Sequence, residues 1–347
     1  MSVDPRRSVE VGDSIEYFLE DQAYHGKAER TIQAYERVLR EFERFLAEEG
    51  RGSTDPAEAT QRECMAWVHT LRAEHAESTI ATYASYLHRF YAYMTQIGAF
   101  EFNPMALVVE EMPERIEANP TRRDVSVEGM RTFVAGISHP LERATVLTLL
   151  KTGLRVGELC NLDCRDLRLE DPPEYAAIAP ARAQLSERPD ALFVSPRPKR
   201  GAETNGEVRS SSNKRQRETV VPVDEELREA LLAYLAIRPD SPSPAEPLFV
   251  NTASNWGRRV EPPTVRSFVE RHARAQGWYH TGGDAAENVT PHYFRHFFTT
   301  HLRDRTGDRG IVKYLRGDVA DDIIDTYTHN WGDRVHTVYH DNIYLLV

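Results

Sequence analysis

The stretch PHYFRHFFTTHL, residues 291–302, is the part of the chain from which the fold can be worked out. Pro291 marks the start of a predicted helix, because the fixed φ angle of proline suits the first helical position. His292 and Arg295 follow three positions apart, a spacing that places both side chains on one face of that helix. A guanidinium binds phosphate oxygens in pairs, and an imidazole donates hydrogen bonds or moves protons. The stretch therefore predicts a helix that presents a phosphate-binding pair.

A second guanidinium stands in TGLRVGELCNL, residues 152–162. Arg155 follows a Thr-Gly turn and opens a predicted helix, and Glu158 lies three positions later on the same face. The Glu158 carboxylate is therefore predicted to hold Arg155 in orientation. Taken alone, the same pattern also fits an exposed helix start with an ordinary ion pair, so its meaning depends on the rest of the chain.

Two further strings add an ammonium group and a phenol. NKRQRETVVPV, residues 213–223, contains Lys214, and a lysine with a lowered pKa can protonate a leaving oxygen. YLRGDVADDIIDTYTHN, residues 314–330, contains Tyr327. A phenol has an ordinary pKa of about 10, so it needs a positive field or a base before it can attack phosphorus. Together these groups supply what is needed to break a DNA phosphodiester without a metal.

The four strings together resemble the signature of tyrosine recombinases, the family of phage integrases and Xer-type recombinases. The resemblance covers most of the chain. It places the catalytic lysine eight residues before the proline that ends the returning strand, which selects Lys214 over Lys199. It places the nucleophile nine residues after a His or Trp in an LGH-like turn. That spacing selects Tyr327 over three other tyrosines: Tyr314, Tyr339 and Tyr344. The implied site consists of Arg155, Lys214, His292, Arg295 and Tyr327, with Glu158 in an orienting role.

Asp318 is a departure from the family pattern, because it occupies the position of that His or Trp. The family His donates a hydrogen bond to a non-bridging phosphate oxygen, whereas an ionised carboxylate only accepts. Three interpretations are open: Asp318 is protonated, it orients Arg155 or Arg295, or it accepts the proton of Tyr327. We favour the orienting role, since a nearby arginine keeps a carboxylate ionised at little cost.

His292 and His296 also have the i,i+4 spacing of a metal-binding pair. No third ligand is evident nearby in the sequence, and the resemblance makes His296 a structural residue. We therefore expect no metal and no cofactor.

Composition places the chain among globular proteins that lack a membrane span or a secretory signal. It has 347 residues, 40% hydrophobic and 28% charged. Three cysteines give no disulfide framework, which fits a cytoplasmic protein. The net charge of −11 is unusual for a DNA-binding protein. Residues 1–120 hold 12 Lys and Arg against 22 Asp and Glu, whereas the rest holds 31 against 32, so the acidity lies mostly in the first third.

Hydrophobic periodicity and turn residues predict a mainly α protein of two domains. Residues 8–110 resemble the all-helical, SAM-like core-binding domain that clamps DNA. Residues 111–124 form a predicted linker, and residues 125–347 an α-rich catalytic domain with a small β-sheet. The helices expected in the first domain cover 13–50, 58–75 and a segment from Ser78 to Met94, with Ser78 as its N-cap. Those expected in the second cover 125–137, 140–151, a segment from 156, 224–237, 264–277, 292–304, 308–316 and 320–328. Residues 191–196 and 219–223 are expected strands, and the polar stretch between them is predicted to be a mobile hairpin or loop that is too hydrophilic for the core.

The resemblance implies a site-specific recombinase that acts on double-stranded DNA through a 3′-phosphotyrosyl intermediate. It implies a homotetramer on DNA and no small-molecule substrate. The apolar tail could pack on a neighbouring subunit or on its own domain. Two other functions fit the same fold: a DNA-binding regulator that has lost the chemistry, suggested by Asp318 and the acidic first domain, and a type IB topoisomerase.

Overall fold

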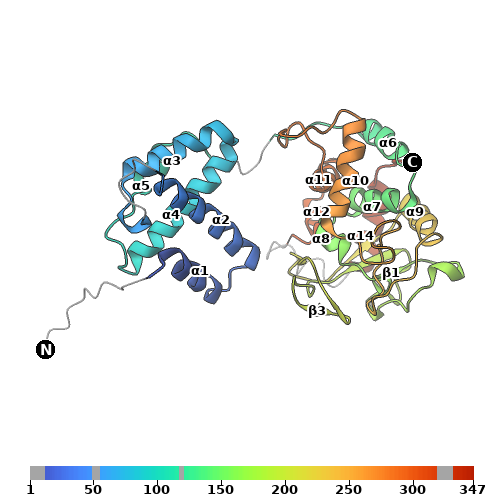
Figure 1. Ribbon diagram of the computed structural model, residues 1–347. Helices are drawn as coiled ribbons and strands as arrows, with labels where there is room; N and C mark the ends of the chain where they lie inside the picture. Colours follow the sequence, from blue (N-terminus) through green and yellow to red (C-terminus); the bar gives the residue numbers. More distant parts are fainter. Residues whose placement is uncertain (1–11, 49–54, 117–120, 319–330) are drawn as a thin grey trace. The chain divides into compact units, whose positions relative to one another are not determined.

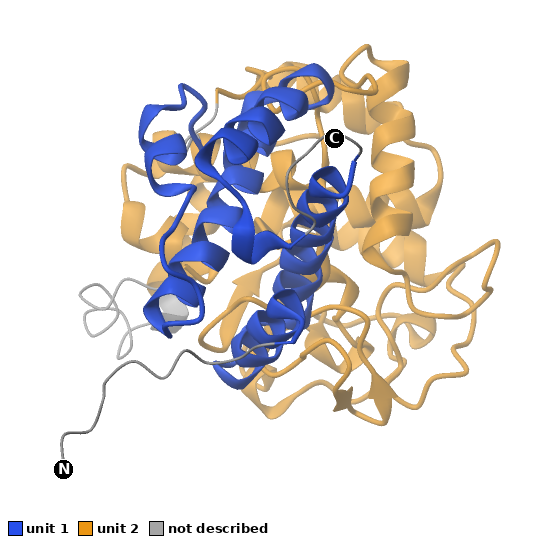
Figure 2. Cartoon of the chain, turned by 60° about the vertical axis from the view of Figure 1, so that its left-hand side comes forward, with its two compact units in different colours: residues 1–119 blue, residues 120–347 orange. Residues whose placement is uncertain are grey.

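The computed structural model describes residues 12–48, 55–116, 121–318 and 331–347. The chain divides into two compact units, Met1–Asn119 and Pro120–Val347 (Figures 1 and 2). Each unit has a hydrophobic core of its own. None of the helices in the described ranges has the apolar length that a membrane crossing requires.

The described part of the first unit is built of helices. They are α1 (Ser14–Tyr24), α2 (Glu29–Leu46), the 3₁₀ turn η1 (Pro56–Glu58), α3 (Gln61–Glu74), α4 (Glu77–Gln96) and α5 (Ala106–Glu111). The prediction of one continuous helix over 13–50 is wrong, because Gly26 adopts a left-handed φ of +75° and separates α1 from α2. The predicted N-cap is also wrong, since α4 begins at Glu77 and Ala76 precedes it.

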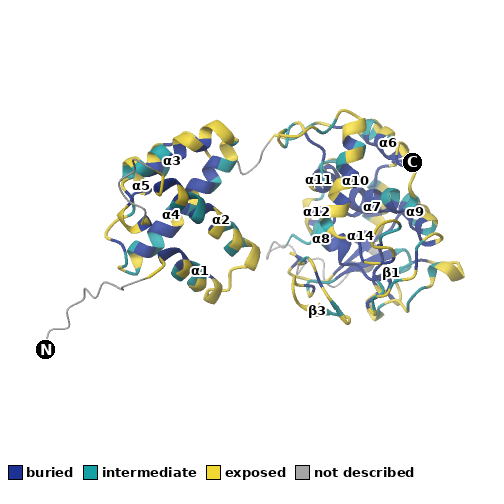
Figure 3. Cartoon of the chain, viewed as in Figure 1, coloured by how far each residue is buried: buried dark blue, intermediate teal, exposed yellow. Residues whose placement is uncertain are grey.

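Aromatic residues of α4 lie in the core of this unit, and Figure 3 shows buried positions along that helix. Tyr83, Phe90 and Tyr91 are buried, and the Tyr91 hydroxyl donates to the carbonyl of Pro56 at 2.8 Å. These three side chains therefore belong to the core and are not available for stacking on DNA bases.

Both ends of the predicted linker pack on the units that they join. Met112 is buried in the core of the first unit, and Glu114 accepts a hydrogen bond from Arg72 Nε at 2.5 Å. At the other end, the main-chain nitrogen of Arg123 donates to the carbonyl of Ala285 in the second unit. Residues 117–120 of this segment lie outside the described ranges.

The second unit surrounds the central helix α7 (Pro140–Thr152) with further helices and a small sheet (Figure 1). The other helices are α6 (Val127–Ala135), α8 (Val156–Cys160), α9 (Glu225–Leu235), α10 (Pro262–Ala275), α11 (Pro291–Thr306), α12 (Arg309–Arg316) and α14 (Trp331–Asn342). Short 3₁₀ turns are η2 (Cys164–Asp166), η3 (Glu174–Ala176) and η4 (Ala183–Leu185). The predicted helix at 320–328 lies outside the described residues, and the predicted mainly α fold with a small sheet is confirmed.

The sheet has the order β1-β2-β5, with antiparallel neighbours. Its strands are β1 (Leu167–Arg168), β2 (Ala191–Val194) and β5 (Thr219–Pro222), and Leu192 pairs with Val221. The two predicted β-rich segments are therefore neighbouring strands.

The polar stretch between β2 and β5 contains a hairpin of β3 (Glu203–Thr204) and β4 (Glu207–Val208). Asn205 and Gly206, both with positive φ, form its turn. The prediction that this stretch is too hydrophilic for the core is wrong, since Arg209, Asn213 and Arg215 are buried. Each of them has polar partners inside the unit, which the sequence does not reveal.

The carboxy-terminal tail packs on its own unit. Tyr339 and Tyr344 are fully buried, and their hydroxyls donate to the carbonyls of Lys151 and Leu150 on α7. The main-chain nitrogen of Leu346 donates to Glu226 Oε2 at 2.8 Å. Of the two placements that the sequence left open, the chain adopts the intramolecular one.

Lys151 is the main polar contact between this tail and α7, and its side chain is 0% exposed. Its Nζ donates to Asp224 Oδ2 at 2.6 Å, to Glu226 Oε2 at 2.5 Å and to the carbonyl of Tyr344 at 2.6 Å. Replacing Lys151 with methionine would leave two buried carboxylates facing each other. Removal of one partner from a buried ion pair typically costs about 3–5 kcal/mol.

We therefore expect Lys151→Met to lower the free energy of unfolding of the second unit by about that amount, as measured by urea unfolding. The exposed Lys313 on α12 is the matched control. A Lys313→Met change should alter stability by less than about 0.5 kcal/mol. Equal stabilities of the two variants would show that the buried cluster contributes little.

Candidate active site

Arg155 is fixed by a buried carboxylate at the start of α8. Its main-chain nitrogen donates to Glu158 Oε2 at 3.0 Å, and its Nη1 donates to Glu158 Oε1 at 3.1 Å. The Glu158 side chain is 0% exposed, whereas that of Arg155 is 29% exposed. Glu158 therefore has the contacts expected of an orienting residue, and part of the guanidinium remains accessible to an anion.

Arg295 lies in the second turn of α11 and is nearly fully buried. Its Nη1 donates to the carbonyl of Gly153 at 2.7 Å and to that of Arg316 at 2.9 Å. Burial, followed by the nearby charge of Arg155, lowers the pKa of Arg295 to about 10, which leaves the group charged at neutral pH.

Gly153 explains why the two arginines meet. It ends α7 in the left-handed conformation, with φ of +63°, and a Cβ at this position would overlap the ring of Phe298 on α11. Only glycine permits both the turn and this close approach. The Thr-Gly turn therefore lies against α11, and Arg155 follows two residues later.

The Asp318 carboxylate contacts both Arg155 and Arg295, and it also contacts a third arginine, Arg316. Its Oδ1 accepts from Arg155 Nη2 at 2.9 Å and from Arg295 Nη2 at 2.7 Å, and its Oδ2 lies 2.9 Å from Arg316 Nη2. Burial alone would raise the pKa of Asp318, but Arg295, Arg316 and Arg155 outweigh it and hold the pKa below its ordinary value. Asp318 is therefore ionised at neutral pH. Of the three interpretations considered above, these contacts fit the orienting role.

Arg215 lies next to this group of side chains. It is buried, its Nη2 donates to the carbonyl of Leu315 at 3.0 Å, and its Nε lies 3.4 Å from Glu158 Oε2. A Cβ at Gly317 would lie 2.7 Å from Arg215 Cγ, so glycine is required where the turn passes this side chain. We call Arg155, Arg215, Arg295 and Arg316, with Glu158 and Asp318, the arginine cluster.

His292 is exposed in the first turn of α11, on the same helix as Arg295. Its partial removal from water, followed by the charges of Arg122, Arg295, Arg155 and Arg316, lowers its pKa from the ordinary 6.5. The imidazole is therefore neutral at neutral pH. As for the alternative metal pair, the described residues contain no group of three or more His, Cys, Asp or Glu side chains that could hold a metal ion.

Lys214 is exposed between two anchored neighbours. Asn213 accepts a hydrogen bond from Asn161 at 2.8 Å and donates one to the carbonyl of Ser195 at 2.7 Å, while Arg215 is held as described above. The main chain at Lys214 is thus fixed on both sides, and its ammonium group is open to solvent. No side-chain hydrogen bond or ion pair among the described residues joins Lys214 to the arginine cluster. The predicted role of Lys214 remains a prediction, as does its preference over the exposed Lys199.

Tyr327, the predicted nucleophile, lies outside the described residues. Its three rivals are described and buried to different degrees. The hydroxyls of Tyr339 and Tyr344 donate to main-chain carbonyls of α7, and burial raises the pKa of each phenol well above its ordinary value. Tyr314 accepts a hydrogen bond from the main-chain nitrogen of Val220, and burial raises its pKa as well. All three are poorly suited to attack a phosphate.

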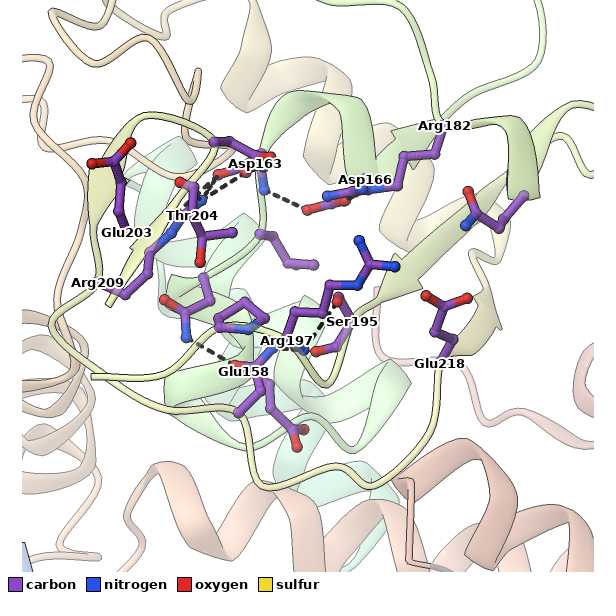
Figure 4. Close-up of a pocket in the computed structure, with 16 residues that line it drawn as sticks. Glu158, Asp163, Asp166, Arg182, Ser195, Arg197, Glu203, Thr204, Arg209 and Glu218 are labelled. Atoms are coloured by element: carbon purple, nitrogen blue, oxygen red, sulfur yellow. Dashed lines mark hydrogen bonds and ion pairs between the residues drawn. The ribbon is translucent and has the colours of Figure 1, made fainter. Parts of the chain in front are cut away.

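Glu158 also lines a cavity of about 320 Å³ beside the β3–β4 hairpin (Figure 4). Asp163 lies in its wall and accepts from Arg209 Nη2 at 2.8 Å and from Arg259 Nη2 at 2.6 Å. Asp166 and Arg182 form a further ion pair there. The Arg209–Asp163 pair and the Arg259–Glu207 pair hold the hairpin against the body of the unit, and the same stretch of chain continues to Lys214 and Arg215.

Sequence reasoning missed Arg215 and Arg316. The sequence does hint at Arg316, since it stands two residues before Asp318 in LRGD, within the string that contains Tyr327. It gives no hint of Arg215, because a basic residue in a polar stretch gives no indication of burial.

Two family models match the chain: the phage integrase N-terminal SAM-like domain over residues 15–98, and the phage integrase family over residues 202–333. The chain belongs to the phage integrase family. The second match spans Lys214, His292, Arg295 and Tyr327, whereas Arg155 lies before it. The predicted family, that of the tyrosine recombinases, is therefore confirmed.

Curated proteins with similar sequences agree with this family membership. Tyrosine recombinase XerC of Pelobacter propionicus is 25% identical over 312 residues, which cover 89% of this chain and 87% of the relative. Tyrosine recombinase XerD of Brucella suis biovar 1 is 27% identical over 338 residues, which cover 93% and 94%.

Solved structures share the fold of this integrase. A Tn1549 transposon integrase in complex with transposon right end DNA has a TM-score of 0.64 at 19% identity, with 95% of this chain and 99% of that chain covered. A lambda integrase from a tetramer bound to a Holliday junction has a TM-score of 0.62 at 16% identity, with 89% and 77% covered. At these identities the likeness concerns the fold.

The arginines around His292 lead to a prediction about its titration. We expect the imidazole to titrate below a pKa of 6.5, because partial burial and, after it, the nearby positive charges oppose protonation. In 1 M KCl its pKa should rise, since the Debye length falls to about 3 Å and the arginine charges are screened. Histidine NMR signals followed against pH would measure this, with the His292 signal assigned by its loss in His292→Gln. A pKa at or above 6.5 in low salt would contradict the arrangement.

Proposed function

We propose that this integrase family member is a site-specific recombinase that cleaves and rejoins double-stranded DNA through a phosphotyrosine. The observation that carries the proposal is the meeting of Arg155 and Arg295 at one point, with Asp318 between them. Two guanidinium groups held at fixed positions from different helices match the geometry of a phosphate with two non-bridging oxygens.

In the proposed reaction the Tyr327 oxygen attacks the scissile phosphorus. The bond to the 5′-oxygen breaks, that oxygen takes a proton, and DNA remains linked to the enzyme through a 3′-phosphotyrosyl bond. A 5′-hydroxyl of a partner strand then attacks this bond and releases the tyrosine. Each step replaces one phosphate ester with another, so no energy source is consumed.

Each residue of the proposed site has a separate task. Arg155 and Arg295 bind the non-bridging oxygens and stabilise the charge that develops on them. Lys214, exposed on a fixed stretch of chain, protonates the leaving 5′-oxygen. His292, neutral at neutral pH, donates a hydrogen bond or carries a proton.

Chain connectivity allows Tyr327 to reach the arginine cluster. It lies nine positions after Asp318, a tether of at most about 30 Å when extended. The burial of Tyr314, Tyr339 and Tyr344 supports the same assignment.

We further propose a homotetramer on two duplexes, by analogy with the lambda integrase tetramer on a Holliday junction. We also propose a cytoplasmic location, where a DNA recombinase would meet its substrate.

The test begins with mapping the covalent attachment points of the protein across the DNA of its own replicon. A plasmid with two copies of the mapped site is then incubated with the protein. Joined products from the two sites are expected. Relaxed plasmid alone would point to a topoisomerase, and bound but intact DNA would point to a regulator without chemistry.

A further inference from the structure

The proposed mechanism leaves one hydrogen-bond donor to the phosphate unaccounted for. The position of Asp318 is the one from which the family donates a hydrogen bond to the phosphate, and an ionised carboxylate has no proton to donate. Its Oδ1 is shared by Arg155 and Arg295, and its Oδ2 by Arg316. The group that occupies the second oxygen of Asp318 is therefore the first place to look for the missing donor.

Arg316 is tied to the site through both its main chain and its side chain. It is the last residue of α12, and its carbonyl accepts from Arg295 Nη1 at 2.9 Å. Gly317 follows in the left-handed conformation, with φ of +68°, and turns the chain toward Asp318. The side chain then reaches back to Asp318 Oδ2 at 2.9 Å. Arg316 is thus held in register with Arg295, and a cation at this place also suits the carboxy-terminal end of a helix.

The charges of the cluster are unequal. Four guanidinium groups, those of Arg155, Arg215, Arg295 and Arg316, share the two carboxylates Glu158 and Asp318. The formal charge of these six residues is therefore +2. Such a positive surplus in a partly buried place favours the binding of an anion. The guanidinium groups repel one another, and a bound anion offsets that repulsion.

Arg316 has unused hydrogen-bonding capacity. Its Nε is buried and has no hydrogen-bond partner among the described residues, and its side chain is 28% exposed. A buried donor without an acceptor is destabilising by about 1–3 kcal/mol, so the arrangement is held in place by its other contacts. The exposed part of the guanidinium leaves donors available to an incoming phosphate oxygen.

We propose that Arg316 is a third phosphate-binding residue of the reaction, and that it supplies the hydrogen bond which Asp318 cannot give. Asp318 is then a positioning residue, which fixes the directions of Arg155, Arg295 and Arg316 through its two oxygens. The Arg316–Asp318 pair takes the place of the single His of the family. This inference rests on the proposed function, since it requires that a scissile phosphate binds at the arginine cluster.

The experiment measures the rate of covalent adduct formation on a suicide duplex that contains the mapped site. Arg316→Met keeps the length of the side chain and removes every donor. We expect it to slow adduct formation by about 10²–10³-fold, the usual effect of removing one oxyanion donor. Affinity for the duplex, measured by fluorescence anisotropy, should change by less than about tenfold, since one phosphate contact among many is lost.

A double variant tests whether the lost function is a hydrogen bond. Arg316→Met with Asp318→His restores the donor of the family at position 318, and adduct formation should recover at least about tenfold over Arg316→Met alone. Arg303→Met is the matched control, because Arg303 is exposed and lies eight residues beyond Arg295 on α11, about 12 Å along the helix. It should form adducts at the rate of the wild type.

The outcomes separate this inference from the proposed function. No adduct with the wild-type protein would reject both. A wild-type adduct with Arg316→Met within about threefold of the wild-type rate would reject the role of Arg316 alone. A slow Arg316→Met that Asp318→His does not improve, although Asp318→His alone forms adducts near the wild-type rate, would also reject it, because Arg316 would then act through the fold rather than as a donor. Circular dichroism of each variant checks that it is folded.

Discussion

Tyr327→Phe is expected to form no covalent adduct with DNA, while it still binds the duplex within a few-fold of the wild-type affinity. The phenylalanine ring retains the size of the side chain and lacks the oxygen that would attack phosphorus. Denaturing gel electrophoresis of a labelled suicide duplex would show the shifted protein–DNA band for the wild type and its absence for the variant.

Tyr339→Phe is the matched control for this change. The Tyr339 hydroxyl is buried and donates to the carbonyl of Lys151, so its removal should lower stability by about 1 kcal/mol and leave adduct formation intact. An adduct that survives in Tyr327→Phe and disappears in Tyr339→Phe would reverse the assignment of the nucleophile.

Arg295→Lys is expected to slow adduct formation by at least about 10²–10³-fold. One guanidinium here donates to Gly153, Arg316 and Asp318 at the same time, at 2.7, 2.9 and 2.7 Å. An ammonium group is a compact charge without the planar fork, so it cannot satisfy these three directions and also contact a phosphate. Because lysine retains the positive charge, a slower rate in this variant would be due to lost hydrogen-bond geometry and not to a change in net charge.

Arg303→Lys on the same helix is the control for Arg295→Lys, and it should leave the rate unchanged because Arg303 is exposed. Buried hydrogen bonds are lost in Arg295→Lys, so its rate should be measured well below its unfolding temperature. A rate within about threefold of the wild type would show that Arg295 does not grip the phosphate.

Much of the fold follows from local sequence signals. Pro291 at the start of α11, Gly153 at the end of α7 and the β-rich runs that form β2 and β5 are all visible in the sequence, because each depends on residues close together in the chain. The break at Gly26 was missed, since the apolar spacing on either side of it fits one helix equally well.

The arginine cluster could be predicted only in part. Arg155 and Glu158 are three residues apart, so their contact follows from helix geometry. Asp318 meets Arg155 across 163 positions, and Arg215 donates to Leu315 across 100 positions. Contacts of that kind depend on the packing of α8, α11 and α12, which no local pattern encodes. The role of Asp318 therefore remained open in the sequence, and Arg316 was not considered.

In the proposed mechanism the arginine cluster binds the scissile phosphate while Tyr327 faces its phosphorus. The most direct test is a crystal structure of the Tyr327→Phe protein bound to a duplex with the mapped site. We expect the scissile phosphate within hydrogen-bonding distance of the Arg155 and Arg295 guanidinium groups, with the ring of residue 327 beside it. A scissile phosphate bound elsewhere, with Arg155 and Arg295 contacting only protein, would rule out the proposed role of the arginine cluster.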